Sequence, residues 1–180
     1  MAAGRGTRFG GDKLLYPVAG IPLAERAFSA LPPDIPGIVV TGDDRIAVLA
    51  EAHPNLSVLL TGDTAHDVAL TIRTGTEALP AEADGAVYMV CDQPWLTRES
   101  VQKLLDAFQT APEFIYVLSD RDRPGNPCLF PRRFFPELCR LPAHRGGKAL
   151  IRKYPDQVRR IPANAPEELE DMDERPSFSP

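Results

Sequence analysis

The sequence predicts one α/β domain spanning residues 1–180, with a mostly parallel sheet. Short apolar segments, several of them β-branched, alternate with segments whose apolar residues recur at helical spacing. Strands that alternate with helices in this way build a sheet that is covered by helices. The chain has 180 residues and no internal repeat, which suits a single hydrophobic core.

Four strands are predicted from the apolar runs. They cover residues 38–41, 57–60, 86–90 and 114–118. In open parallel sheets, ligands bind just beyond the carboxyl ends of the strands. Polar residues that directly follow a strand, such as Asp92 and Gln93, are therefore the first candidates for function.

Four helices are expected between these strands. Pro22 suits the first turn of one helix, which ends before Pro32. One of the aspartates at 43–44 can cap the second helix, and Thr97 can cap the fourth. The segment 65–79 predicts the third helix, because its apolar residues lie on one helical face.

Composition excludes several classes of protein. The formal net charge of −5 argues against a broad nucleic-acid-binding face. We find no run of about 20 apolar residues and no signal peptide, so we expect a cytoplasmic protein without a membrane partner. The three cysteines are widely spaced, which argues against disulfides or a zinc site. Residues 163–180 are acidic and contain proline, and we expect a loosely packed tail there.

The opening segment MAAGRGTRFGGDKLL combines glycines with basic residues. It does not form a P-loop, because Leu14 follows Lys13, nor a dinucleotide fingerprint, because Phe9 stands where the last glycine belongs. Small residues let backbone N–H groups approach an anion, and Arg8 and Lys13 add positive charge. The alternative is a flexible, solvated N-terminus. If the segment is a loop that holds an anion, its binding residues are Ala2, Ala3, Gly4, Arg5, Gly6, Arg8 and Lys13.

This loop resembles the signature of nucleotidyltransferases with a glycosyltransferase-A-like fold, and more narrowly that of molybdenum cofactor cytidylyltransferases and guanylyltransferases. Their loop reads roughly LA(A/G)GxSxRMGxxK, which Gly4, Arg8, Gly10 and Lys13 match. Further stretches are similar to family motifs: CDQP at 91–94, GNPCLFPRRFFPEL at 125–138, HRGGK at 144–148 and LEDMD at 169–173. The resemblance implies a Rossmann-like three-layer sandwich with a mixed, mostly parallel sheet, of the nucleotide-diphospho-sugar transferase type.

The resemblance also implies a reaction. A nucleoside monophosphate passes from a nucleoside triphosphate to the terminal phosphate of molybdopterin, and pyrophosphate leaves. Arg8 and Lys13 would hold the triphosphate, Asp92 would coordinate Mg²⁺, and Asp173 would be the second metal-binding carboxylate. The alternatives are a helix cap or turn former at Asp92 and a solvated acidic tail at Asp173.

Five other positions are candidate binding residues. Arg73 stands near the nucleotide in relatives, and it is equally well interpreted as an exposed helix arginine. We expect Trp95 to anchor its loop in the core rather than to pack beside the acceptor. The acceptor-binding candidates are Gln93, Asn126, His144 and Arg145, of which the last two could instead only cover a loop.

The first glycine-rich triplet bears on the choice of nucleotide. In the resembling group, Ala-Ala-Gly tends to accompany cytidine and Ala-Gly-Gly guanosine, so Ala2-Ala3-Gly4 favours CTP over GTP. The acceptor would be molybdopterin carrying molybdenum, and a molybdoenzyme or its chaperone would be a further partner.

Relatives carry a hydrophobic strand before the loop, and we expect this strand to lie upstream of Met1. The alternative is a truncated chain, in which a poorly anchored loop would weaken activity. Three rival hypotheses remain. A non-catalytic nucleotide-binding or partner-binding module is favoured by the altered segment at 61–75. An NAD(P)-dependent oxidoreductase is disfavoured by the failed dinucleotide fingerprint. A sugar-phosphate nucleotidyltransferase is disfavoured by the short chain.

Overall fold

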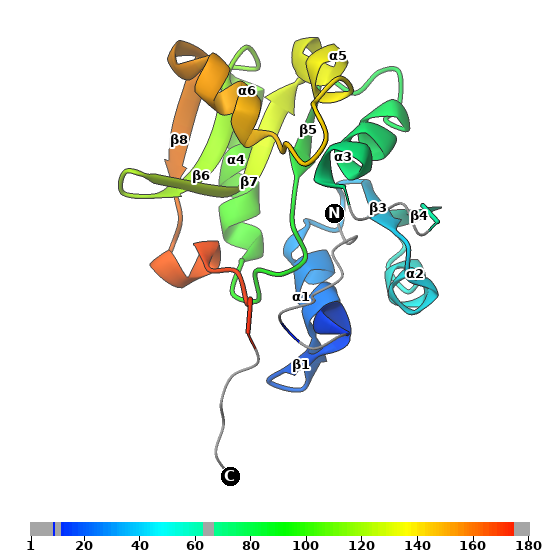
Figure 1. Ribbon diagram of the computed structural model, residues 1–180. Helices are drawn as coiled ribbons and strands as arrows, with labels where there is room; N and C mark the ends of the chain where they lie inside the picture. The colour runs from blue at the N-terminus through cyan, green and yellow to red at the C-terminus, as the bar shows by residue number, and fades with distance from the viewer. Residues whose placement is uncertain (1–8, 10–11, 63–66, 175–180) are drawn as a thin grey trace.

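The computed structural model describes residues 9, 12–62 and 67–174, and Figure 1 shows how its elements are arranged. The strands are β1 (Pro17–Val18), β2 (Ile21–Pro22), β3 (Gly37–Thr41), β4 (Leu56–Leu60), β5 (Gly85–Tyr88), β6 (Ile115–Asp120), β7 (Arg123–Pro131) and β8 (Val158–Pro162). The α-helices are α1 (Leu23–Ala30), α2 (Asp44–Glu51), α3 (Val68–Glu77), α4 (Arg98–Thr110), α5 (Phe135–Leu138) and α6 (Lys148–Lys153). The short 3-10 helices are η2 (Lys13–Leu15), η3 (Arg132–Phe134), η4 (Pro155–Gln157) and η5 (Pro166–Leu169).

The largest sheet is mixed and has the strand order β5-β7-β6-β8. Strands β5, β6 and β8 run in one direction, and β7 runs antiparallel between β5 and β6. A second, parallel sheet pairs β3 with β4, and β1 and β2 form a small antiparallel hairpin. Helices and strands alternate through most of the chain, as the sequence predicts for an α/β protein.

The four-stranded sheet has helices on both faces. Side chains alternate between the faces along each strand, and in β6 both sets are apolar, so both faces are buried. On β6, Tyr116 and Leu118 pack with α4, whereas Ile115 and Val117 point to the opposite face. That opposite face is covered by α5 and α6, with Leu150 of α6 in its core. In Figure 1, α6 lies in front of the sheet and α4 behind it, so the helices and the sheet form three layers.

A third core cluster joins the β3–β4 sheet to the loop after β5. Helices α1 and α2 pack against β3, and the buried side chain of Cys91 belongs to the same cluster. Leu14 and Leu15 of η2 pack against it from the N-terminal side. This cluster therefore holds η2 close to the loop that follows Cys91.

The predicted caps are confirmed at two helices. The Asp43 carboxylate accepts from the Arg45 N–H at 2.9 Å, and the Thr97 hydroxyl accepts from the Ser100 N–H at 3.3 Å. The third helix begins at Val68 with Asp67 as its cap, later than predicted. None of the described helices is long and apolar enough to cross a membrane.

The structure contradicts part of one expectation about packing and the whole of another. Residues 166–169 of the expected loose tail form η5, and Glu168 and Leu169 are buried because they dock on α4 and β7. Trp95 does not anchor its loop in the core. Its side chain is 46% exposed and packs under the guanidinium of Arg26, at 5.6 Å from the ring centroid.

Candidate active site

Three charged side chains from distant parts of the chain meet at the loop after β5. The Lys13 ammonium donates to Asp92 Oδ2 at 2.9 Å and to Asp173 Oδ1 at 3.2 Å. Lys13 is 10% exposed, Asp92 30% and Asp173 64%, so the cluster opens to solvent on the Asp173 side. The two carboxylates that the sequence predicts as metal ligands therefore converge on one cationic centre.

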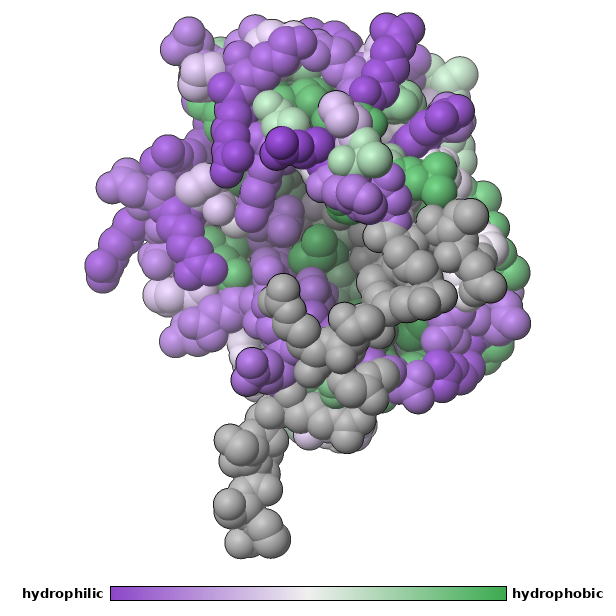
Figure 2. Space-filling view, viewed as in Figure 1, coloured by the Kyte–Doolittle hydropathy of each residue, from purple (hydrophilic) through white to green (hydrophobic). Residues whose placement is uncertain are grey.

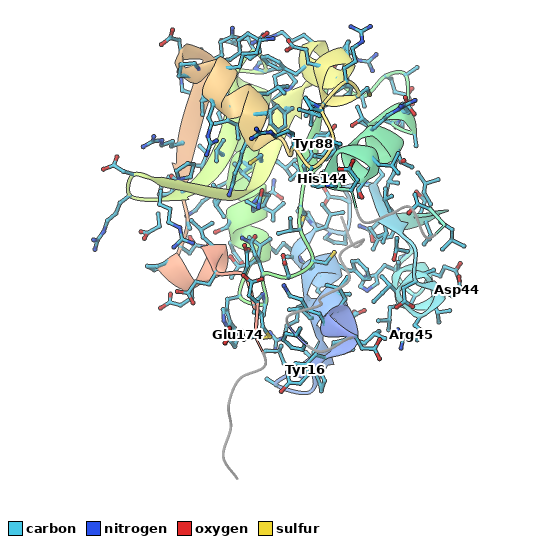
Figure 3. The ribbon with its side chains drawn as sticks, viewed as in Figure 1. Tyr16, Asp44, Arg45, Tyr88, His144 and Glu174 are labelled. Atoms are coloured by element: carbon cyan, nitrogen blue, oxygen red, sulfur yellow. The ribbon has the colours of Figure 1, made fainter. Side chains whose placement is uncertain are left out.

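The position of Lys13 follows from the local structure of η2. Asp12 has a left-handed backbone (φ 42°), and its carbonyl accepts from the Leu15 N–H at 3.0 Å, which closes the short helix. Asp12 also accepts from Arg45 of α2 at 2.6 Å. This exposed ion pair joins η2 to α2, and Figure 3 shows where Arg45 lies on that helix. The backbone turn of η2 and its contact with α2 therefore set the position of Lys13.

Asp173 reaches the site because the C-terminal segment is tied to the Asp92 backbone. The Met172 N–H donates to the Asp92 carbonyl oxygen at 2.8 Å, and the Asp173 N–H donates to the Asp171 carbonyl oxygen at 3.1 Å. In Figure 3, Glu174 lies where the described part of this segment leaves the body of the protein. Residues 171–173 therefore run alongside the loop after β5.

The charges in this cluster shift two pKa values. Burial alone would lower the pKa of Lys13, but the hydrogen bonds and charges of Asp92 and Asp173 outweigh it, so the pKa is raised. Desolvation raises the pKa of the Asp171 carboxyl, and the charges of Asp92 and Asp173 add to that effect. A hydrogen bond from Gln93 and the charge of Lys13 oppose it only in part. The site thus holds more negative charge than Lys13 alone balances.

Gln93 lies at the base of the same loop and is 2% exposed. Its Oε1 atom is buried and accepts no hydrogen bond in the part of the chain that the structure describes. A buried acceptor without a donor costs roughly 1–3 kcal/mol. Its amide oxygen can accept a hydrogen bond from a ligand that enters beside Asp92.

The donor set at this site suits a divalent cation. Mg²⁺ needs only one or two carboxylates when phosphate and water oxygens complete its shell. Asp92 and Asp173 both pair with the Lys13 ammonium, so a metal ion that took the place of this ammonium, with Lys13 turned towards the phosphates, would meet oxygens of both. Within residues 9, 12–62 and 67–174, no group of three or more His, Cys, Asp or Glu side chains could hold a metal by itself. The remaining ligands would have to come from substrate and water.

The predicted acceptor residue His144 lies on a loop next to α3. Its backbone N–H donates to Asp67 Oδ1 at 2.7 Å, and its φ of 62° turns the chain sharply there. The side chain is 85% exposed. The surface is hollowed at its centre (Figure 2), and His144 lies at the upper border of this hollow (Figure 3). Arg145 follows on the same exposed loop.

Two further candidates lie on other elements. Arg73 is on the exposed face of α3, where its Nε pairs with Glu77 at 3.0 Å, as an exposed helix arginine would. Asn126 is on β7, half-buried beside the Cys128 thiol. The other nucleotide-binding candidates lie outside the described residues: Ala2, Ala3, Gly4, Arg5, Gly6 and Arg8.

Asp171 is not among the site residues predicted from the sequence. It lies two residues before Asp173, so the Asp-Met-Asp pattern at 171–173 was the available signal. This signal was hidden because Glu170 and Glu174 are acidic too, and an exposed acidic tail would have the same composition. The raised pKa of Asp171 distinguishes it from that run.

Three comparisons bear on the fold and the family. Residues 1–158 match the family model of the MobA-like NTP transferase domain. A relative from Methylibium petroleiphilum, named molybdenum cofactor guanylyltransferase, is 29% identical over 163 residues, which cover 84% of this chain and 78% of the relative. Rv0371c from Mycobacterium tuberculosis has a similar structure, with a TM-score of 0.75 and 25% identity over 90% of this chain and 84% of that one.

Two other solved structures have a similar fold. A second structure of the Mycobacterium tuberculosis protein is a complex with manganese, with a TM-score of 0.68 and 24% identity, covering 90% of this chain and 84% of that one. A nucleotidyl transferase from Methanothermobacter thermautotroptrophicus is 20% identical, with a TM-score of 0.77 over 96% of this chain and 89% of that one. These likenesses confirm the predicted Rossmann-like α/β fold.

Proposed function

Because the chain belongs to the family of MobA-like NTP transferase domains, we propose that it transfers a nucleoside monophosphate to the terminal phosphate of molybdopterin cofactor. One observation carries the proposal: the Lys13 ammonium lies between Asp92, on the loop that follows β5, and Asp173 of the C-terminal segment. A cationic side chain and two carboxylates beyond the carboxyl end of a strand suit the binding of a metal–triphosphate complex.

In the proposed reaction, an oxygen of the acceptor phosphate attacks the α-phosphorus of the nucleoside triphosphate. A new P–O bond forms, the bond from the α-phosphorus to its bridging oxygen breaks, and pyrophosphate leaves with the electron pair. Charge develops on the attacking and leaving oxygens, so catalysis depends on positioning and neutralisation. Lys13 and Arg8 would neutralise the triphosphate, and Mg²⁺ held by Asp92 and Asp173 would supply further positive charge.

The acceptor would enter beside Gln93. The buried Oε1 of Gln93, which has no hydrogen-bond donor among the described residues, can accept a hydrogen bond from an N–H or O–H of the acceptor. His144 and Arg145, on the same exposed loop, would meet the acceptor phosphate, with Asn126 contributing from β7. The exposed imidazole and guanidinium are free to turn towards an anion without losing a buried contact.

The choice of nucleotide rests on sequence, because Ala2-Ala3-Gly4 lies outside the described residues. That triplet supports CTP. The curated relatives with this match are named guanylyltransferases, which favours GTP as the second candidate. If the triplet reads the base, Ala3→Gly should raise the rate with GTP relative to CTP. An unchanged ratio of the two rates would argue against that role.

Two rival hypotheses fare differently. An NAD(P)-dependent oxidoreductase is not retained, because the family match over residues 1–158 is to NTP transferases. A nucleotide-binding module without turnover would keep the same site. It predicts nucleotide binding without release of pyrophosphate.

The test is Mg²⁺-dependent release of pyrophosphate from CTP or GTP in the presence of molybdopterin cofactor. We expect release by the full chain, with a preference for CTP, and loss of at least about 100-fold in rate in Asp92→Asn. Glu82→Gln, an exposed acid distant in the sequence, is the matched control and should keep the rate. Binding of nucleotide without release would instead support the non-catalytic module.

A further inference from the structure

One buried carboxylate lies outside the cluster around Lys13. Glu168 of η5 is 2% exposed and accepts four hydrogen bonds. Its Oε1 accepts from the backbone N–H of Thr97 at 3.2 Å and from the Thr97 hydroxyl. Its Oε2 accepts from the Ser100 hydroxyl at 2.6 Å and from the Asn164 N–H at 2.8 Å. Every oxygen of this buried carboxylate is therefore paired.

The partners of Glu168 show what it joins. Thr97 and Ser100 form the first turn of α4, where backbone N–H groups and the helix dipole favour a negative charge. Stability alone does not call for this arrangement, because replacing a buried charge by a well-packed apolar side chain is often neutral or stabilising. The carboxylate instead fixes the orientation of η5 on α4, because four donors at set positions can all be satisfied in only one arrangement.

The two segments that Glu168 joins both lead into the candidate active site. The loop at 92–97 begins with Asp92 and ends at Thr97. The segment at 168–173 begins with Glu168 and ends at Asp173. The Met172 N–H closes the connection by donating to the Asp92 carbonyl oxygen at 2.8 Å. Hydrogen bonds made by Glu168 at one end and by Met172 at the other therefore join the segment of Asp173 to the loop of Asp92.

A neighbouring contact fixes the same segment from the other side. Leu169 is buried on β7, where it packs directly over Gly125. Asn164 adds a hydrogen bond from its amide nitrogen to Thr97 Oγ1 at 3.3 Å. These contacts leave the segment little freedom before it reaches Asp171 and Asp173. Asp173 itself is the most exposed member of the cluster and has no comparable anchor of its own among the described residues.

We propose that Glu168 is a positioning residue, which holds the segment of Asp171 and Asp173 against the loop of Asp92 and so sets the spacing of the two metal-binding carboxylates. This deepens the proposed function and rests on it for the role of the metal. Groups that orient metal ligands without touching the metal typically change metal affinity by about 10- to 100-fold when they are lost. Substitution of Glu168 should therefore weaken metal binding while the domain remains folded.

The test compares three single variants of the full chain. Glu168→Gln keeps the shape but places an amide against donors, Ser100→Ala removes one donor, and Glu167→Gln alters an exposed acid on the same 3-10 helix. Two readouts are independent of turnover: hydrogen exchange of the Met172 amide by NMR, and the dissociation constant of Mn²⁺ alone by electron paramagnetic resonance.

We expect Glu168→Gln to raise the Mn²⁺ dissociation constant about tenfold and to speed exchange at Met172, while amides in the centre of β6 keep their protection. Ser100→Ala should shift both readouts less and in the same direction, and Glu167→Gln should shift neither. If Glu168→Gln does not fold, Ser100→Ala carries the same test.

Wild-type Mn²⁺ affinity in a folded Glu168→Gln, or in Ser100→Ala where only that variant folds, would overturn the proposal. So would faster exchange throughout the sheet with unchanged Mn²⁺ affinity, because that pattern indicates a purely structural role. Failure of the unmodified chain to release pyrophosphate would refute the proposed function and leave both readouts of Glu168 valid, since neither depends on turnover.

Discussion

Replacing Lys13 by methionine removes the ammonium between Asp92 and Asp173 and keeps most of the apolar side chain. The bond to Asp92 at 2.9 Å is largely shielded on the lysine side, and a charged hydrogen bond of that kind stabilises by about 1.5–3 kcal/mol. The bond to Asp173 is exposed and adds about 0–1 kcal/mol. Because Asp92 is itself partly exposed, we expect unfolding free energy to fall by about 1–2 kcal/mol in total.

For a chain of this size that loss lowers Tm by about 2–8 °C. The pH dependence provides a sharper check. The pKa of Lys13 is raised above its usual 10.5, so its stabilisation is fully present below pH 10.5 and is lost as pH rises through the folded-state pKa. The difference in unfolding free energy between wild type and Lys13→Met should therefore stay constant from neutral pH to about pH 10 and shrink above it.

The assay is urea unfolding followed by circular dichroism across that pH range. Lys148→Met, an exposed lysine at the start of α6, is the matched control and should change stability by less than about 0.5 kcal/mol. Equal stability of wild type and Lys13→Met at neutral pH, or a difference that grows above pH 10.5, would refute the assigned ion pairs.

Three other predictions concern the surroundings of the site. Asp171→Asn should raise stability at neutral pH by less than about 1 kcal/mol, because the pKa of Asp171 is raised; the gain should shrink as pH falls through that raised pKa and vanish well below pH 3.8, where a persisting gain would contradict the cause. Gly125→Ala should cost about 1–3 kcal/mol by urea unfolding, because its Cβ would lie 2.8 Å from Leu169 Cδ2; an unchanged midpoint would contradict this packing. Burial raises the pKa of Tyr88 to about 12, so the difference between the absorbance titrations of wild type and Tyr88→Phe should show this tyrosine ionising near pH 12; ionisation near pH 10 would contradict its burial.

The parts of the fold that sequence predicts are those with a strong local signal. The β-branched run of β3 and the capped starts of α2 and α4 are examples. Strand β7 was not predicted as a strand, because Pro124, Gly125 and Pro127 interrupt it, and proline lacks the N–H that a strand needs. Strand β8 is short and carries two arginines. Only its pairing with β6 makes it a strand.

The candidate site likewise contains residues that the sequence predicts and one that it does not. The resemblance predicted Lys13, Asp92 and Asp173 as members of one site, and the structure brings their charged atoms together. Glu168 could not be distinguished by sequence from its acidic neighbours, because burial depends on how η5 docks on α4. Burial of an acid needs partners from other elements, and no local pattern specifies them.

The central proposal is that Lys13, Asp92 and Asp173 form a nucleotidyltransferase site. The most direct measurement is the transfer of radioactive α-phosphorus from labelled CTP or GTP to molybdopterin cofactor, by wild type and by Asp92→Asn. The proposal predicts that the label enters the cofactor with wild type and not with Asp92→Asn. Label that stays in the nucleotide with wild type, or equal transfer by both proteins, would contradict it.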